Sequence, residues 1–495
     1  MSNSKHPTVA VDTDKIPPGI PYIIGNEAAE RFCFYGMRTI LVVFMTQYLM
    51  NSSGVLAVMT KEDAKGWFHV FVSAVYFLPF FGAILSDALW GKYRTIMVLS
   101  VVYCLGSFAL SLDSTRLGLA VGLALIAMGS GGIKPCVSAN VGDQFGPRNQ
   151  HLLSRVFGWF YFSINFGSCF STMLTPFLLD PPSQAVTSFL ATDPGFWTVL
   201  KTIDPNMVLA FLERHCAPWV TALHGPKLAF GVPGVFMMLA TMVFWLGRNQ
   251  FVRVPPAGKE FIRETFSARS LLIIAGLVPI FLAEAVFWSL WDQTSSAWVL
   301  QAEGMNLRCI FDWKASQVQL VNPIFVLALI PVCSYGLYPL ISRVFPLTPL
   351  RKIGLGLFLM VPSFLITAWV QSQLDLGLKP TIAWHFLAFA IISLAEIMVS
   401  ITCLEFAYTQ APKRLKSLLM SLNLMSISLG NAVTATINFL IPTIEKIGVV
   451  KQLFGEKALH GPNYFIFFAL CMLLTACGFI FVALRYQERG IAEAN

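Results

Sequence analysis

Apolar residues in this 495-residue chain gather into twelve runs that are separated by polar and charged segments. A helix needs about 20 predominantly apolar residues to cross the hydrocarbon core of a bilayer, and each run reaches that length. The runs therefore predict twelve membrane-spanning helices. Several contain prolines that favour tilted or kinked helices, namely Pro79, Pro135, Pro279, Pro323 and Pro331. The spans are expected at 21–50, 65–90, 93–112, 117–142, 152–178, 227–247, 270–299, 315–342, 351–371, 381–409, 416–443 and 462–485.

The spacing of these runs divides the chain into two similar halves. Six runs precede a short charged segment and six follow it, so the fold class expected is an all-α membrane protein with two six-helix bundles. The first bundle is predicted at 21–247 and the second at 270–487. The segment 248–269 is expected to be a cytoplasmic linker, and residues 1–20 and 488–495 are expected to be cytoplasmic tails.

The composition supports a membrane location. Hydrophobic residues make up 56% of the chain and charged residues only 12%, against about 25% charged in an ordinary soluble domain. This excludes a soluble enzyme, and also a nucleic-acid-binding protein despite the net charge of +8. The ten cysteines do not form a disulfide framework, because most lie in apolar runs. Cys216 and Cys309 fall in external loops and are a candidate pair if that side is oxidising.

Lysine and arginine predict the orientation of the chain. The segments on the side of both termini hold more of these residues than the opposite segments, which places the termini in the cytoplasm. Between the second and third spans, Gly82 to Asp87 and then Gly91-Lys-Tyr-Arg94 resemble the loop signature of the major facilitator superfamily. The segment from Gly336 to Lys352 occupies the corresponding place in the second half.

Ionisable side chains inside the predicted spans carry the functional signal. Each costs at least about 2.5–3.5 kcal/mol at the centre of a membrane helix unless it is paired or hydrated. So many charges are not expected to face lipid, and we infer a polar, water-accessible cavity between the halves that serves translocation. The nine side chains are Glu27, Glu30, Arg31, Arg38, Lys134, Glu284, Asp292, Glu396 and Glu405.

The first span concentrates four of these charges. Glu27, Glu30 and Arg31 are three and four residues apart, so they share one face of a helix. An arginine between two carboxylates allows one acid to bind a proton while the other stays paired. Arg38 lies two turns further along the same face.

Other polar residues in apolar runs are open to two interpretations. Asn165 and Asn322 can donate to and accept from a peptide bond, but each could equally bond a neighbouring helix. His69 lies in an aromatic run, where it either carries protons or packs as a neutral side chain. Glu284 and Glu405 are interpreted as structural or rim charges.

Five sequence blocks resemble those of the proton-coupled oligopeptide transporter family. Residues 27–36 read Glu-Ala-Ala-Glu-Arg-Phe-Cys-Phe-Tyr-Gly, which is similar to the family's Glu-x-x-Glu-Arg-Phe-x-Tyr-Tyr-Gly signature. Residues 131–145 and 160–168 resemble its blocks in the fourth and fifth spans. Residues 287–293 and 405–412 extend the similarity into the second half. The resemblance implies the major facilitator superfamily fold and a proton-coupled symporter of di- and tripeptides and of peptide-like drugs.

The resemblance also implies roles for individual residues. Arg38 and Lys134 would hold the peptide carboxylate and Glu396 its ammonium group. The residues implied in proton coupling are Glu27, Glu30, Arg31, His69 and Asp292. The residues implied in substrate binding are Tyr35, Arg38, Tyr76, Lys134, Asn165, Trp288, Asn322 and Glu396. Two departures from the family pattern stand out. Phe34 replaces a usual tyrosine, and Asp292 replaces the glutamate of many bacterial members.

The predicted mechanism is alternating access with two alternative ion pairs. Without substrate, Arg38 is expected to pair with Asp292 and Lys134 with Glu396, which closes one gate or the other. The protein is expected to act as a monomer in the cell membrane, with protons as the coupling ion and no cofactor or metal.

Three alternatives remain at this point. The closest is a transporter of the same fold that carries nitrate, histidine or another small charged solute. A membrane-embedded enzyme is disfavoured, because neither a His-Glu-x-x-His nor a Gly-x-Ser-x-Gly motif occurs. A sensor that does not transport is the third.

Overall fold

The computed structural model describes residues 7–10, 13–179, 225–256, 258, 263, 267–309, 311–410, 416–445 and 459–486. Within these residues the protein is helical apart from a small antiparallel hairpin of β1 (Arg308–Cys309) and β2 (Phe311–Asp312). The predicted connector between the fifth and sixth spans, with Cys216, lies outside the described residues, so the pairing of Cys216 with Cys309 is untested. Of the predicted linker 248–269, residues 257, 259–262 and 264–266 lie outside them as well.

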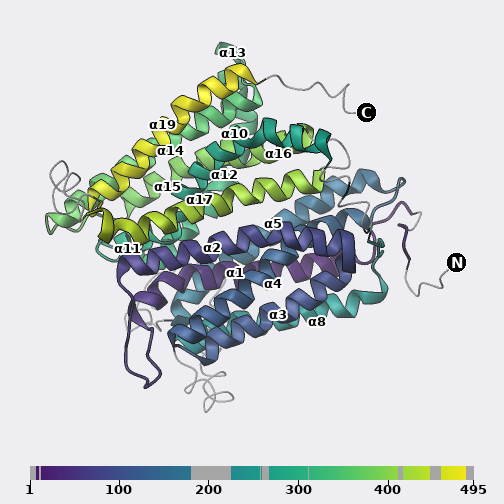
Figure 1. Ribbon diagram of the computed structural model, residues 1–495, viewed down its shortest axis with the longest axis horizontal. Helices are drawn as coiled ribbons and strands as arrows, with labels where there is room; N and C mark the ends of the chain where they lie inside the picture. Colours follow the sequence, from purple (N-terminus) through teal and green to yellow (C-terminus); the bar gives the residue numbers. More distant parts are fainter. Residues whose placement is uncertain are drawn as a thin grey trace, which may run out of the picture.

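The helices fall into two groups that follow the two halves of the chain (Figure 1). The first half comprises α1 (Ile20–Gln47), α2 (Lys61–Ile84), α3 (Lys92–Leu112), α4 (Arg116–Asp143), α5 (Leu153–Leu179) and α8 (Pro226–Leu246). The second comprises α10 (Ala268–Trp291), α11 (Ala297–Ala302), α12 (Val321–Pro331), α13 (Tyr338–Val344), α14 (Pro349–Asp375), α15 (Ala383–Glu396), α16 (Thr402–Gln410), α17 (Lys416–Ile444) and α19 (Pro462–Arg485). Each half has its own large cluster of buried apolar side chains.

The helix lengths confirm the predicted membrane spans. Eleven segments of the described chain are helical, long and apolar enough to cross a bilayer. The first span, α1, is a twelfth helix of 28 residues, and it carries four of the charged side chains expected inside the membrane. The fold class predicted from the sequence is therefore correct, and each half supplies six spans.

Three spans contain short π-helical segments, at Leu85–Trp90, Val332–Leu337 and Ile397–Ile401. The second of these follows Pro331 directly. In contrast, Pro79 lies inside a helix that continues for several residues beyond it.

The predicted span 270–299 is interrupted, which the sequence analysis did not foresee. Helix α10 ends at Trp291, a 3₁₀ turn covers Asp292–Ser295, and Ser296 leaves the helical conformation with φ −130° and ψ −83° before α11 begins. Hydroxyl and carboxylate side chains at this break bond groups on other helices. Ser295, for example, donates to Gln319 at 2.6 Å. Short polar side chains of this kind compete with regular helical bonding.

The two halves meet mainly at the end of the molecule opposite the termini. The N- and C-terminal ends of the described chain lie at one end of the bundle, whereas α11 and the start of α2 lie at the other (Figure 1). At that far end Gln47 donates to Glu303 at 2.7 Å, and Trp67 contacts Phe439 with ring centroids 5.6 Å apart. A side chain on Gly66 would clash with Phe439, so α2 and α17 pack closely there.

Candidate functional site

The charged face of α1 forms the compact cluster that its spacing predicts. Arg31 donates from Nε to Glu27 at 2.7 Å, and the same nitrogen lies 3.3 Å from Glu30. Ser130 of α4 donates to the other oxygen of Glu30 at 2.8 Å. Both carboxylates are only 2% exposed. One arginine thus serves two buried acids, which is the arrangement expected of a site that can take up a proton.

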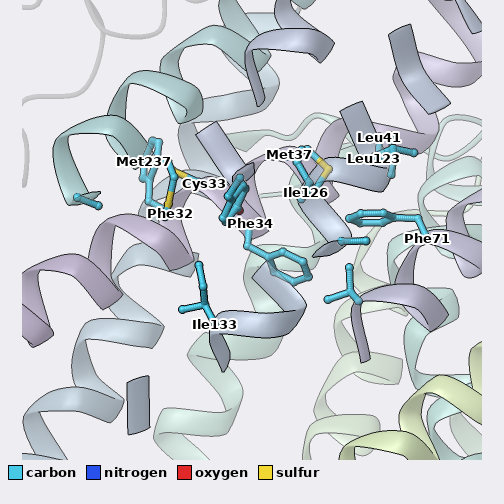
Figure 2. Packing of buried hydrophobic residues seen from close by; sticks show 14 of the residues in the cluster. Phe32, Cys33, Phe34, Met37, Leu41, Phe71, Leu123, Ile126, Ile133 and Met237 are labelled. Atoms are coloured by element: carbon cyan, nitrogen blue, oxygen red, sulfur yellow. The ribbon is translucent and has the colours of Figure 1, made fainter. Parts of the chain in front are cut away.

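Apolar side chains of the same helix anchor this cluster in the apolar core of the first half. Figure 2 shows Phe32, Cys33, Phe34, Met37 and Leu41 of α1 among buried side chains from α2, α4 and α8. The cluster is therefore held in place by this packing, because close-packed interiors resist displacement of their side chains.

One ion pair joins the two halves. Arg38 of α1 pairs with Asp292, which lies at the helix break after α10, and both side chains are almost fully buried. The guanidinium also lies 5.6 Å from the ring centroid of Phe68 and 5.5 Å from that of Trp291. The predicted pairing of Arg38 with Asp292 is formed in this structure.

The second oxygen of Asp292 begins a chain of polar contacts. Asn431 of α17 donates its amide N–H to Asp292 at 2.5 Å, and its oxygen lies 2.7 Å from Nδ1 of His69. The other ring nitrogen of His69 lies 3.0 Å from the Ser296 hydroxyl. A neutral imidazole satisfies both contacts, since Nδ1–H donates to the amide oxygen and Nε2 accepts from the hydroxyl. The histidine is thus linked to Arg38 through one amide and one carboxylate.

Lys134 of α4 is a buried cation without an acceptor. Among the described residues its ammonium nitrogen has no hydrogen-bond partner and is buried from solvent. It lies 4.3 Å from the ring centroid of Phe34 and 3.9 Å from that of Tyr76. Such cation–π contacts replace only part of the hydration that an ammonium group loses on burial.

Glu396, at the end of α15, is an acid that no cation pairs with among the described residues. It accepts from the indole N–H of Trp291 at 2.9 Å and from the amide of Asn322 at 2.8 Å. Both donors are neutral, and no Lys or Arg in the described chain lies within salt-bridge distance of it. The predicted pair between Lys134 and Glu396 is not formed in this structure, because each group contacts neutral side chains of its own half. That pairing stays a prediction for the alternative conformation.

Comparisons with known proteins show the family to which the chain belongs. The model of the POT family matches residues 93–276 and 268–453. The Drosophila melanogaster protein named peptide transporter family 1 is 33% identical over 400 residues, which cover 72% of this chain and 48% of the fly protein. The human solute carrier family 15 member 2 is 30% identical over 420 residues, which cover 76% of this chain and 51% of the human protein. The chain belongs to the POT family.

Solved structures of POT family members share the fold over nearly the whole chain. The structure of the POT family transporter PepTSo matches with a TM-score of 0.79 and 30% identity, covering 96% of this chain and 99% of the other. A structure described as a proton dependent oligopeptide (POT) family transporter matches with a TM-score of 0.70 and 31% identity, covering 93% and 100%. The chain spans about half the length of the curated relatives it matches. The comparisons confirm a multi-pass membrane protein from a family of transporters, not of enzymes.

The structure also places the two tyrosines and the asparagine of the fifth span that the POT resemblance implicates in substrate binding. Tyr35 and Tyr76 are half-buried beside the Arg38 and Lys134 cations. The amide of Asn165 donates to the carbonyl of Tyr161 in its own helix at 2.9 Å, so its role toward a substrate stays a prediction. The described residues contain no cluster of His, Cys, Asp or Glu that could hold a metal ion.

The sequence analysis overlooked the partners of the buried acids. Asn431 was not singled out, although it connects Asp292 to His69. Glu284 was interpreted as a structural or rim charge, but it is 2% exposed and accepts from Trp288 at 3.2 Å and from Asn423 at 2.5 Å. An asparagine in an apolar run is a weak signal by itself, and only the packing of α17 on α10 reveals these contacts.

Proposed function

We propose that this protein is a proton-coupled symporter that imports di- and tripeptides by alternating access between its two bundles. The observation that carries the proposal is the pair of unmatched charges in the site. Lys134 lacks an anion and Glu396 lacks a cation. A short peptide is a zwitterion, and its carboxylate and ammonium groups supply both counter-charges at once. Peptide-like drugs that keep both charges belong to the same substrate class.

The remaining site residues are assigned to the same substrate. The peptide carboxylate binds between Lys134 and Arg38, and the ammonium group binds Glu396. Tyr35, Tyr76, Trp288, Asn165 and Asn322 line the pocket, and the two amides bond the peptide backbone. The name of the Drosophila melanogaster relative supports a peptide substrate, since that protein is named as a peptide transporter.

Proton coupling is proposed to act through Arg38. As long as Asp292 is ionised it holds the guanidinium in the ion pair that joins the halves. A proton on Asp292 removes that charge and frees Arg38 for the peptide carboxylate. Asn431 bonds the second oxygen of Asp292 and contacts His69, so the charge state of the histidine is coupled to that of Asp292 through this amide. The cluster of Glu27, Glu30 and Arg31 is the second proton site.

The location and orientation proposed follow from charge. The end of the bundle that carries both termini is assigned to the cytoplasm by its excess of Lys and Arg, in a cell membrane. Residues 21–247 and 270–487 then act as the two moving bundles, joined by the cytoplasmic linker 248–269, and the protein works as a monomer. With this orientation the bundles touch at their outer ends, so the conformation is closed to the outside.

A carrier of nitrate, histidine or another small charged solute is the second candidate within the same fold. An inorganic anion would need Lys134 but would be repelled by Glu396, which argues for a zwitterion. Histidine carries both charges, but it has no peptide bond for the amides of Asn165 and Asn322. Competition therefore separates these solutes from peptides.

The test is uptake of labelled dialanine into proteoliposomes under an imposed pH gradient. We expect concentrative uptake that di- and tripeptides inhibit and that nitrate and free histidine do not. Lys134→Gln should abolish this uptake, whereas Lys227→Gln, which removes an exposed lysine at the start of α8, should leave it unchanged. Preserved uptake in Lys134→Gln, or inhibition by nitrate instead of peptides, would refute the proposal.

A further inference from the structure

A small polar pocket lies at the terminal end of the first bundle, outside the transport site. Its volume is about 180 Å³, and it is enclosed by the start of α3, the end of α4 and the segment Phe251–Pro256 that follows α8. The pocket therefore joins the first bundle to the beginning of the connection to the second. It includes Gly91, Lys92 and Arg94, the basic cluster that the sequence analysis singled out and that the transport mechanism does not use.

The floor of this pocket offers donors that have no acceptor. Asn140 of α4 lines it and is 2% exposed, yet its amide nitrogen has no hydrogen-bond partner. Helix α3 begins at Lys92, and its first residues line the pocket, so backbone N–H groups that have no partner inside the helix lie at the pocket wall. The positive end of the helix dipole lies in the same place. The amide of Asn140, the backbone N–H groups and the helix dipole would all stabilise a bound anion.

The charged side chains around the pocket are predominantly positive. Lys92 and Asp143 neutralise each other across 2.6 Å, which leaves Arg94 and Arg253 without an acidic partner among the residues that the structure describes. Arg253 lies over the ring of Tyr93 at 3.8 Å and donates from Nη2 to a backbone carbonyl, but its Nε is buried and unpartnered. Burial lowers the pKa of Arg253, and the neighbouring Arg94 and Arg248 lower it further. The guanidinium is thus short of a counter-ion.

The pocket wall is also fixed in position. Gln144, near the end of α4, accepts from the backbone N–H of Val252 at 2.9 Å and donates to the carbonyl of the same residue at 3.3 Å. It also donates to the side-chain oxygen of Asn140 at 3.3 Å, which leaves the amide nitrogen of Asn140 as the free group. These bonds hold Arg253 and Asn140 on two sides of one space.

We propose that this pocket binds the phosphate headgroup of an anionic membrane lipid. A phosphate group accepts simultaneously from an arginine, an amide and the N–H groups of a helix end. The lipid source is favoured by the rim of the pocket, where Trp90 and Val254 are 44% and 43% exposed and Leu89, beside Trp90, is 62% exposed. Exposed tryptophan and aliphatic side chains at a helix end are typical of the level of lipid headgroups. A bound headgroup would clamp the segment Phe251–Pro256 to the first bundle.

The experiment measures binding to the full-length chain in detergent by native mass spectrometry. Phosphatidylglycerol and phosphatidylcholine are titrated in parallel, and inorganic phosphate is tested as a competitor. We expect preferential binding of phosphatidylglycerol. Arg253→Gln should weaken that binding about tenfold, since it removes a charge-assisted bond. The control is Arg351→Gln, which removes an arginine from the corresponding end of the second bundle, outside this pocket.

A second variant keeps the test sharp. Asn140→Asp preserves the shape of the side chain but replaces the free donor by a charge that repels phosphate, so binding should be lost. If this buried variant does not fold, Arg253→Gln decides alone. Equal binding of the two lipids, or unchanged binding in Arg253→Gln, overturns the proposal. Displacement of the lipid by millimolar inorganic phosphate overturns the lipid as the source. None of these readouts involves peptide uptake, so the result is independent of the proposed transport function.

Discussion

Two buried acids, Glu284 within α10 and Asp292 directly after it, meet the same kind of partner but belong to different networks. Asp292 and Glu284 each accept from an asparagine of α17, Asn431 and Asn423 respectively, and both contacts measure 2.5 Å. The two acids are as far apart along the chain as the two asparagines are. This equal spacing, in the same chain direction, is what α10 and α17 show when they pack in parallel. Only Asp292 also pairs with Arg38 of the first half. Contact between a buried acid and an asparagine of α17 therefore occurs twice in the second bundle. At Asp292 the additional contact with Arg38 turns this pair into a link between the two bundles.

The close approach of α10 and α17 explains why both contacts form. A Cβ on Gly430 would clash with the carbonyl oxygen of Ala285 and would lie 2.9 Å from the backbone nitrogen of Ser289. The glycine therefore allows the two backbones to touch between the two acids. Asn431, next to this glycine, is thereby brought within reach of Asp292. Small residues at such contacts are the usual means by which membrane helices approach closely.

The largest expected difference between the two acids is in transport. Asp292→Asn should abolish proton-driven uptake of dialanine, because the ion pair can no longer be switched by a proton. Glu284→Gln should keep uptake within about twofold of the unaltered protein. Its amide oxygen can still accept from one of Trp288 and Asn423, and losing the other charge-assisted bond lowers stability by about 1.5–3 kcal/mol. Uptake in proteoliposomes measures both variants. Equal loss of uptake in both would show that the comparison is wrong.

The next largest effect is expected in stability. Arg38→Gln leaves Asp292 buried without a cation, and the loss of one partner of a buried ion pair costs about 3–5 kcal/mol. Thermal unfolding in detergent should show a clear decrease in melting temperature. The double variant Arg38→Gln with Asp292→Asn should recover much of that loss, because no uncompensated charge remains. Without such recovery, the ion pair is not the source of the destabilisation.

The two asparagines are expected to differ in which property they affect. Asn431→Leu removes one donor from Asp292 and leaves His69 without its acceptor, so it should lower both uptake and stability. Asn423→Leu should lower stability alone, and each variant should cost about 1–3 kcal/mol. The melting temperature and the uptake rate are measured on the same preparation. If Asn423→Leu reduces the uptake rate as much as Asn431→Leu, Glu284 also belongs to the coupling network.

The smallest effect on stability is expected for the two serines at the ends of the hydrogen-bond networks of Asp292 and Glu284. Ser296→Ala removes the hydroxyl that contacts His69, and Ser426→Ala removes one that donates to the carbonyl of Asn423 at 2.6 Å. Each loss should cost about 1 kcal/mol. Only Ser296→Ala should alter the dependence of uptake on the external pH, because only this serine touches the chain that ends at Asp292. Identical pH profiles for the two variants would place His69 outside the coupling chain.

The sequence predicts the twelve spans well because their signal is local. Each span depends on its own length and hydrophobicity. The cluster of Glu27, Glu30 and Arg31 is also a local signal, because the spacing of these residues places them on one face of a helix. The pairing of Arg38 with Asp292 also forms as predicted, since few cations and acids are available inside the membrane.

The remaining features depend on contacts between distant segments. The contact of Asn431 with Asp292 becomes visible only when α10 and α17 are packed in parallel. The position of Lys134 between Phe34 and Tyr76 involves three helices, and nothing in their local sequence specifies it. The helix break at Ser296 has only a weak local signal, the run of polar residues 292–296, because neither glycine nor proline lies there.

The break after α10 has a mechanical consequence. An uninterrupted helix would transmit any displacement rigidly from one membrane surface to the other. Here the departure of Ser296 from helical geometry divides the span into α10, of 24 residues, and α11, of 6 residues. Rotation about a few backbone bonds at such a joint costs less than bending an intact helix. A change of charge at Asp292, as proposed for proton coupling, would therefore act at this joint, and the short α11 would reorient while the long α10 stays in place.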